Sequence, residues 1–169
     1  MMVMFGDDPE LRNTIEFDDL TPHEQQENLW KRMKVAYEKH KEAFFTNSMF
    51  GPPHIGLGEY FQCSLPLTLH IGMFRLSIEN LANAEQAAYW MPLIKNIDIV
   101  GCYAQSELGH GSNVAGLETT ATFDKIKDEF VIHTPTISAT KYWPGDMGMF
   151  ASHAIVFARL LIAENDYGV

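Results

Sequence analysis

Apolar and polar residues alternate with helical spacing in the first half of the chain. The spacing predicts a helix over residues 22–45. Its apolar face consists of Leu29, Met33, Ala36, Tyr37 and Phe44. Thr21 can cap the helix start, Pro22 is tolerated in the first turn, and Glu24 completes a capping box. The preceding residues 1–20 are polar and aperiodic, and we expect an arm that orders only against the rest of the fold.

Two further helices are expected before residue 97. Residues 49–59 contain too many glycines and prolines for regular structure and are predicted to form a loop. A second helix is predicted to begin near Pro66, with an inward face of Leu69, Met73, Leu76 and Leu81. Asn83 and Gln86 form another capping box, which opens a third helix that Pro92 should end or kink.

The pattern changes to strands after Asn96. Residues 97–104 and 117–123 are expected to be strands, and residues 124–128 turn the chain back into a strand at 130–132. Another strand is expected before Trp143, and a long apolar one over 153–163. The prediction is an α+β fold: an N-terminal arm and helical domain over 1–96, followed by an incomplete antiparallel β-domain over 97–169.

The final residues predict an incomplete chain. The sequence stops at Val169, where a strand returning from the turn at 164–168 should begin. An open sheet of this kind leaves backbone groups unpaired and a core face uncovered. We therefore expect the natural protein to continue beyond this point.

Composition excludes several classes of function. The formal net charge of −10 repels nucleic acid and anionic lipid. No apolar run approaches the ~20 residues that span a bilayer, so an intracellular soluble protein without membrane insertion is expected. The two cysteines, Cys63 and Cys102, lack the spacing of a disulfide framework or zinc site and are expected to be buried thiols. No histidine pair has the spacing of metal ligands, and no metal is expected.

Residues 102–113, CYAQSELGHGSN, form the first motif that can bind a ligand, and we call it the glycine-turn motif. A strand leads into a turn in which Gly109 and Gly111 leave backbone N–H groups unobstructed, which suits a phosphate or the edge of a flavin. It is not a dinucleotide-binding fingerprint, since Val114 stands where the third glycine would be. A plain connection between strands remains the alternative.

Residues 141–146, KYWPGD, form the second such motif, the tryptophan-turn motif. An aromatic pair meets a rigid turn, and Gly145 can bring its amide close to a planar ligand. A hairpin turn with a core tryptophan is the alternative.

Four segments together resemble the acyl-CoA oxidases of the acyl-CoA dehydrogenase superfamily. These are LHIGMF at 69–74, EQAAYWMPLI at 85–94, GCYAQSELGHGSNVAGLETTATFD at 101–124 and KYWPGDMG at 141–148. The resemblance implies a helical domain, a β-domain and a C-terminal helical bundle, with FAD between the last two. The bundle is absent from this chain.

The resemblance also implies the cofactor-binding residues. They are Tyr103, Ala104, Gln105, Ser106, Gly111, Ser112 and Gly145. Trp143 would wall one edge of the flavin ring. Many family members have threonine at the position of Ser106, and either hydroxyl can hydrogen-bond the ring's carbonyl side. Gly145 also favours an oxidase, since related dehydrogenases carry a bulkier residue there and a side-chain-free position leaves room for dioxygen.

The implied reaction converts a fatty acyl-CoA to a trans-2-enoyl-CoA and then yields hydrogen peroxide. Its catalytic glutamate comes from the C-terminal bundle; Glu107 and Glu118 do not match it, and no catalytic residue is assigned here. The resemblance further implies a homodimer in the peroxisome. An acyl-CoA dehydrogenase, and a non-catalytic truncated paralogue acting as a partner subunit, remain alternatives. The aromatic and methionine residues of 61–91 line either the acyl pocket or an ordinary core.

Overall fold

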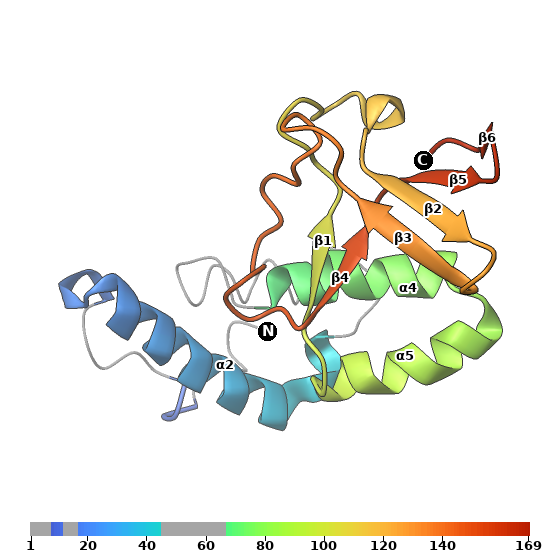
Figure 1. Ribbon diagram of the computed structural model, residues 1–169. Helices are drawn as coiled ribbons and strands as arrows, with labels where there is room; N and C mark the ends of the chain where they lie inside the picture. The colour runs from blue at the N-terminus through green and yellow to red at the C-terminus, as the bar shows by residue number, and fades with distance from the viewer. Residues whose placement is uncertain (1–7, 12–16, 45–66) are drawn as a thin grey trace. The chain divides into compact units, whose positions relative to one another are not determined.

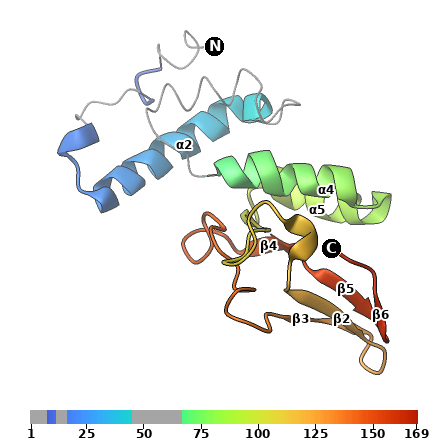
Figure 2. The same ribbon diagram turned by 90° about the horizontal axis from the view of Figure 1, so that it is seen from above.

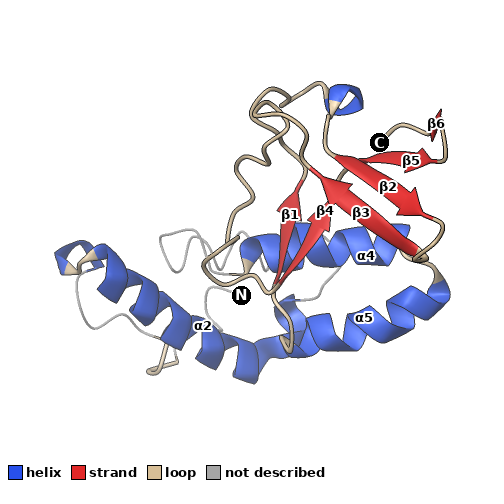
Figure 3. Cartoon of the chain, in the orientation of Figure 1, coloured by secondary structure: helices blue, strands red, loops and turns tan. Residues whose placement is uncertain are grey.

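Helices come first along the chain and strands second, as Figure 3 shows by element type. The computed structural model describes residues 8–11, 17–44 and 67–169. Two units make up the chain, Met1–Asp98 and Ile99–Val169. This order of elements confirms the α+β class, while the assignment of 1–96 and 97–169 as functional domains stays a prediction. In the described ranges, no helix is both long and apolar enough to cross a bilayer.

The first long helix, α2 (Pro22–Phe44), confirms the prediction for residues 22–45. Four of the five residues predicted on its apolar face are buried, namely Leu29, Met33, Ala36 and Tyr37. The side chain of Phe44 lies outside the described part. The predicted loop over 49–59, Cys63 and the helix start near Pro66 also lie outside it.

The second helical segment begins with the π-helical stretch η2 (His70–Phe74) and continues as α4 (Arg75–Leu81). The predicted inward face was wrong in part, because Leu81 is 72% exposed while Ile71 and Phe74 are buried. Leu76 and Leu81 both lie in α4, after the π-helical stretch. In a regular α-helix a separation of five positions turns Leu81 about 140° away from Leu76, which places it on another face.

Both predicted capping boxes are present. At the start of α2, Thr21 N–H donates to Glu24 Oε2 at 2.9 Å, and Glu24 N–H donates to Thr21 Oγ1 at 3.4 Å. At the start of α5 (Ala84–Asn96), Gln86 N–H donates to Asn83 Oδ1 at 2.8 Å and Asn83 N–H to Gln86 Oε1 at 3.0 Å. Each box satisfies two backbone donors that the first turn leaves unpaired.

Pro92 was expected to end or kink α5; it does not end the helix at once, which continues for four more residues to Asn96. Contacts beyond the proline hold its last turn: the hydroxyl of Tyr37 on α2 donates to the carbonyl of Lys95. The helix ends where Ile97 adopts a left-handed conformation with φ of 57°. The strand predicted from residue 97 consequently begins only at Gly101. In both views α5 runs alongside α4 (Figures 1 and 2).

The second unit contains two sheets. One pairs β1 with β4, and the other has the strand order β3-β2-β5-β6 (Figure 1). The strands are β1 (Gly101–Ala104), β2 (Thr120–Asp124), β3 (Glu129–His133), β4 (His153–Val156), β5 (Arg159–Ile162) and β6 (Asn165–Asp166). The hairpin predicted around residues 124–128 is confirmed as β2–β3.

The expectation of an antiparallel β-domain needs correction. The hairpin pairs β2–β3 and β5–β6 are antiparallel, but β1–β4 and β2–β5 are parallel, so the second sheet is mixed. Strands in the parallel pairs are far apart in sequence and are joined by long connections rather than tight turns. Periodicity indicates where a strand lies but not which distant strand it pairs with.

The single strand predicted over 153–163 is also divided in two. β4 belongs to the first sheet, where the N–H of Phe157 just beyond it donates to Ala104 O at 3.1 Å. β5 belongs to the second sheet, and the N–H of Arg159 donates to Thr119 O at 2.8 Å. The chain thus crosses from one sheet to the other at residues 157–158.

The edge strand β3 exposes apolar side chains on both faces. Phe130 is 53% exposed, Val131 46% and Ile132 54%, although successive residues of a strand point to opposite sides. Within the described residues, only β2 pairs with β3. The other rim of β3 therefore carries unpaired backbone groups beside apolar side chains.

Candidate functional site

The structure brings the two motifs together through backbone hydrogen bonds. Leu108 N–H donates to Thr140 O at 2.9 Å, and Tyr142 N–H donates to Ser106 O at 3.0 Å. The strand predicted before Trp143 is absent from the described chain; this segment instead forms an isolated antiparallel bridge to the glycine-turn motif. The candidate site therefore lies entirely within the second unit.

A buried ion pair underlies this junction. Lys141 Nζ lies 3.1 Å from Glu107 Oε1, with 12% of the lysine side chain and 0% of the glutamate side chain exposed. The same ammonium donates to the carbonyl of Gln105 at 3.1 Å and to that of Phe157 at 2.6 Å. Its three protons thus match three acceptors.

The carboxylate of Glu107 accepts hydrogen bonds from the chain entering β2 as well. Glu118 N–H donates to its Oε2 at 2.8 Å, and Thr119 N–H donates to its Oε1 at 2.9 Å. Burial on its own raises the pKa of Glu107, but these N–H donors and the Lys141 ammonium lower the pKa to about 2. Glu107 is therefore an ionised structural group and a poor proton acceptor.

The predicted residues on and after β1 have different surroundings. The Tyr103 hydroxyl donates to Gln105 Oε1 at 2.8 Å, and its ring packs 5.0 Å from that of Phe157. Burial raises the pKa of Tyr103, so its hydroxyl stays protonated. Ala104 is 1% exposed, and its carbonyl accepts the N–H of Phe157; its role in cofactor binding stays a prediction.

Ser106 and Gly145 retain free hydrogen-bonding groups. Among the described residues, no protein atom accepts from the N–H of either residue or pairs with the Ser106 hydroxyl. The aromatic pair next to Gly145 is open, with Tyr142 58% and Trp143 86% exposed. Trp143 has a φ of 65°, a conformation that costs a non-glycine residue ~1 kcal/mol or more. The alternative of a core tryptophan was wrong for the described chain.

The turn itself is closed by paired backbone bonds. Glu107 and His110 exchange two N–H to carbonyl bonds of 3.1 Å each. Gly109 packs so closely that an added Cβ would lie 2.8 Å from Ser138 Cβ, whereas a Cβ at Gly111 would meet nothing within 4 Å. Gly111 and Ser112 are exposed, and no bond in the described part joins either of them to Gly145.

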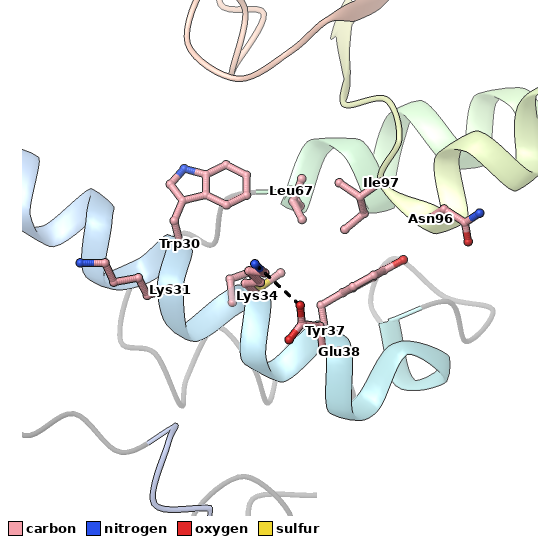
Figure 4. A pocket seen from close by; sticks show the side chains of 9 residues that line it. Trp30, Lys31, Lys34, Tyr37, Glu38, Leu67, Asn96 and Ile97 are labelled. Carbon is pink, nitrogen blue, oxygen red and sulfur yellow. Dashed lines mark ion pairs between the residues drawn. The ribbon is translucent and has the colours of Figure 1, made fainter.

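An apolar pocket of about 500 Å³ lies in the first unit, separate from these motifs. Figure 4 shows Trp30 and Tyr37 from α2 facing Leu67 and Ile97. Lys34 and Glu38 pair at 3.9 Å on its rim. Among the described lining residues, Leu67 alone comes from the 61–91 stretch, and residues 61–66 lie outside the described part, so the assignment of that stretch stays open. Of the polar groups in its described lining, Lys34 and Glu38 pair with each other, and the Tyr37 hydroxyl donates to the carbonyl of Lys95.

Comparison with known proteins decides the family. A family model described as acyl-coenzyme A oxidase N-terminal matches residues 1–100. The chain belongs to the acyl-CoA oxidase family. Peroxisomal acyl-coenzyme A oxidase 1 of Arabidopsis thaliana is 56% identical over 101 residues, which are 60% of this chain and 15% of that protein. An acyl-coenzyme A oxidase of Debaryomyces hansenii is 36% identical across 100% of this chain and 24% of its own length.

Solved acyl-CoA oxidase structures share the fold of nearly the whole chain. The tomato enzyme is 38% identical with a TM-score of 0.84, covering 99% of this chain and 25% of that one. Acyl-CoA oxidase-1 of Caenorhabditis elegans, solved in complex with FAD and ATP, is 31% identical with a TM-score of 0.84, covering 98% and 25%. The chain thus spans about a quarter or less of the length of these relatives.

The sequence did not reveal the role of Lys141 and Glu107. Both residues lie inside the two motifs, yet the sequence assigned neither of them a role. The only expectation for Glu107 was that it is not the catalytic base. A charged residue within a glycine- and aromatic-rich segment is a signal for a buried partner, since unpaired charges are costly to bury. A second cluster was missed as well: Glu118 accepts from Ser138 Oγ at 2.8 Å and lies 3.0 Å from His110 Nε2.

Proposed function

We propose that this chain is the N-terminal portion of an FAD-dependent acyl-CoA oxidase. The enzyme would oxidise fatty acyl-CoA to trans-2-enoyl-CoA and pass the electrons to dioxygen, which gives hydrogen peroxide, as the first step of peroxisomal fatty-acid β-oxidation. One observation carries the proposal: the glycine-turn and tryptophan-turn motifs pair within a fold shared with acyl-CoA oxidases, some of them solved with FAD.

The free groups of the site suit FAD. An isoalloxazine ring offers carbonyl oxygens and ring nitrogens along one edge and a flat apolar face. Ser106 and Gly145 supply uncommitted N–H groups, Ser106 adds a hydroxyl, and Trp143 adds an open aromatic surface. The exposed N–H groups at Gly111 and Ser112 suit a phosphate oxygen. The residues present therefore fit this cofactor.

Each residue has a distinct task in this proposal. FAD, when bound, supplies the hydride acceptor for the β-carbon of the acyl chain. Ser106 and Gly145 donate hydrogen bonds to the ring edge that gains negative charge, which favours reduction. Trp143 keeps water from one side of the ring, and Tyr103 holds the Gln105 amide in place through its 2.8 Å hydrogen bond.

None of these residues is proposed as the base that removes the proton from the α-carbon. Glu107 is held ionised in a pair with Lys141 and is inaccessible. Glu118 accepts from Thr136, His110 and Ser138, and these donors lower its pKa. A carboxylate stabilised in this way is a weak base, so another glutamate would carry out the abstraction.

The location, assembly and domain roles are inferred from the family. Several relatives are named peroxisomal acyl-coenzyme A oxidases, and we extend that location to this chain. We also propose a homodimer for the whole enzyme, the helical domain over 1–96 and the flavin-binding β-domain over 97–169. Fatty acyl-CoA and dioxygen are the proposed substrates.

A chimeric enzyme tests the proposal. The chain would replace the matching quarter of the tomato acyl-CoA oxidase, with which it aligns over 99% of its own length. We expect the purified chimera to keep its flavin absorption through dialysis and to release peroxide when a long-chain acyl-CoA is added under air. Reduction of a dye without oxygen consumption would indicate a dehydrogenase. A folded, flavin-loaded chimera that oxidises no acyl-CoA would refute the proposed activity.

A further inference from the structure

The ammonium of Lys141 joins segments that are distant in sequence. It bonds to Gln105 O after β1, to the carboxylate of Glu107, and to Phe157 O where the chain passes from β4 to β5. Through Glu107 it also reaches the N–H groups of 118–119, which lead into β2. This pair therefore lies at the junction of the two sheets of the second unit.

The bond to Gln105 also sets the direction of a proposed flavin contact. The carbonyl of Gln105 and the N–H of Ser106 belong to one planar peptide group, and in a trans peptide they point in opposite directions. Lys141 holds that carbonyl at 3.1 Å, so the Ser106 N–H is directed away from the ammonium, where no described protein atom accepts from it.

A second effect follows from the position of Lys141 in the chain. It directly precedes Tyr142, whose N–H bonds to Ser106 O at 3.0 Å, and it lies four residues before Gly145. The lysine thus anchors the beginning of the tryptophan turn to the strand that carries Ser106. Its three protons are all used in these contacts, which leaves none for a ligand.

We infer that Lys141, acting through Glu107 and Gln105, is a positioning residue. It keeps Ser106 and Gly145 in register so that both can bind the same ligand. The identity of that ligand as FAD rests on the function proposed above. A lysine that only stabilised the fold would, when removed, loosen the whole second unit. Removal of a positioning lysine would instead loosen the contacts between the two motifs first.

The test uses Lys141→Met, which keeps the side chain's length but removes its protons, and Lys141→Arg, which keeps the charge. Lys127→Met is the matched control, since Lys127 is 66% exposed and pairs with Glu129 at 3.5 Å. Amide hydrogen exchange is measured on the 169-residue chain, and FAD affinity on the chimera. Glu107→Gln replaces Lys141→Met if that variant does not fold, with the same outcomes expected.

In Lys141→Met we expect exchange at the N–H groups of Tyr142 and Thr119 to accelerate about tenfold or more, while Val131 on β3 changes little. We expect FAD to bind Lys141→Met about tenfold more weakly than the wild type. Lys141→Arg should restore most of the slow exchange and most of the FAD affinity, and Lys127→Met should resemble the wild type in both measurements.

Three results would overturn the inference. They are unchanged exchange at Tyr142, uniformly faster exchange across the second unit, and local opening with unaltered FAD affinity. A wild-type chimera that binds no FAD would count against the proposed function instead. In that case the exchange at Tyr142 and Thr119 still decides whether Lys141 holds the two motifs in register.

Discussion

Replacing Glu107 with glutamine should reveal how much its charge stabilises the second unit. The pKa of Glu107 falls from 4.5 to about 2 in the folded chain. Since a tenfold change in proton affinity equals ~1.4 kcal/mol, this difference corresponds to about 3 kcal/mol of stability. That is a large part of the 5–15 kcal/mol by which domains are typically stable. The amide of Gln would also direct an N–H₂ group toward the donors that the carboxylate now satisfies.

The sign of the pH dependence follows from the lowered pKa. A carboxylate with a depressed folded pKa contributes fully above its ordinary value of 4.5 and loses that contribution as the pH falls toward about 2. The assay is urea unfolding of both proteins at several pH values, followed by the amide signal of Thr119. We expect Glu107→Gln to be less stable by roughly 3 kcal/mol near neutral pH, and the gap to close by about pH 2.

Other carboxylates with lowered pKa values, such as Glu118, are common to both proteins and cancel in the difference. Glu129→Gln serves as the control, because Glu129 is exposed and its pair with Lys127 should contribute less than ~1 kcal/mol. If the gap for Glu107→Gln were as large at low pH as at neutral pH, the charge of Glu107 would not be the source of the stability. The assignment of the buried ion pair as the stabilising group would then be wrong.

Four further substitutions test local features. Asn83→Ala removes the cap of α5 and should lower the unfolding free energy by about 1 kcal/mol in urea titrations followed by far-UV circular dichroism. Gly109→Ala places a Cβ 2.8 Å from that of Ser138 and should lower the free energy of unfolding by about 1–3 kcal/mol. Gly111→Ala has open space around it and should leave the free energy of unfolding nearly unchanged. Equal losses of stability in the two variants would contradict the packing described for Gly109. Trp143→Gly removes a side chain from a residue with positive φ, so thermal stability should be unchanged or slightly higher. The same variant should bind FAD more weakly in the chimera, and unchanged FAD binding would exclude Trp143 from the flavin site.

Local sequence signals predicted local structure well. The capping residues Thr21 and Asn83 mark the starts of α2 and α5, because a cap bonds within its own first turn. The hairpin at 124–128 was found for the same reason, since Asp124 Oδ1 accepts from N–H groups of its own turn. The family resemblance was confirmed by the family model that matches residues 1–100 and by relatives that align with the rest of the chain as well.

Features that depend on distant partners were not predictable from local pattern. Pro92 was expected to end or kink α5, but the helix continues past it, and a contact from Tyr37 on another helix holds the turn beyond it. The parallel pairing of β1 with β4 and the Lys141–Glu107 pair likewise join residues far apart in sequence. The predicted flavin contacts remain predictions, although the structure joins Ser106 to the residue beside Trp143.

The edge strand β3 has a consequence for how this chain behaves at high concentration. The rim of β3 that has no strand partner among the described residues can accept a strand from a neighbouring molecule, and Phe130, Val131 and Ile132 would cover such a junction from both sides. Strands of this kind, with little charge in the middle, are templates for intermolecular β-pairing. Lys127 and Glu129 flank the apolar run on one side and act as gatekeepers there. A lysine in place of Val131 is therefore the change that we would make first to obtain concentrated, monodisperse material.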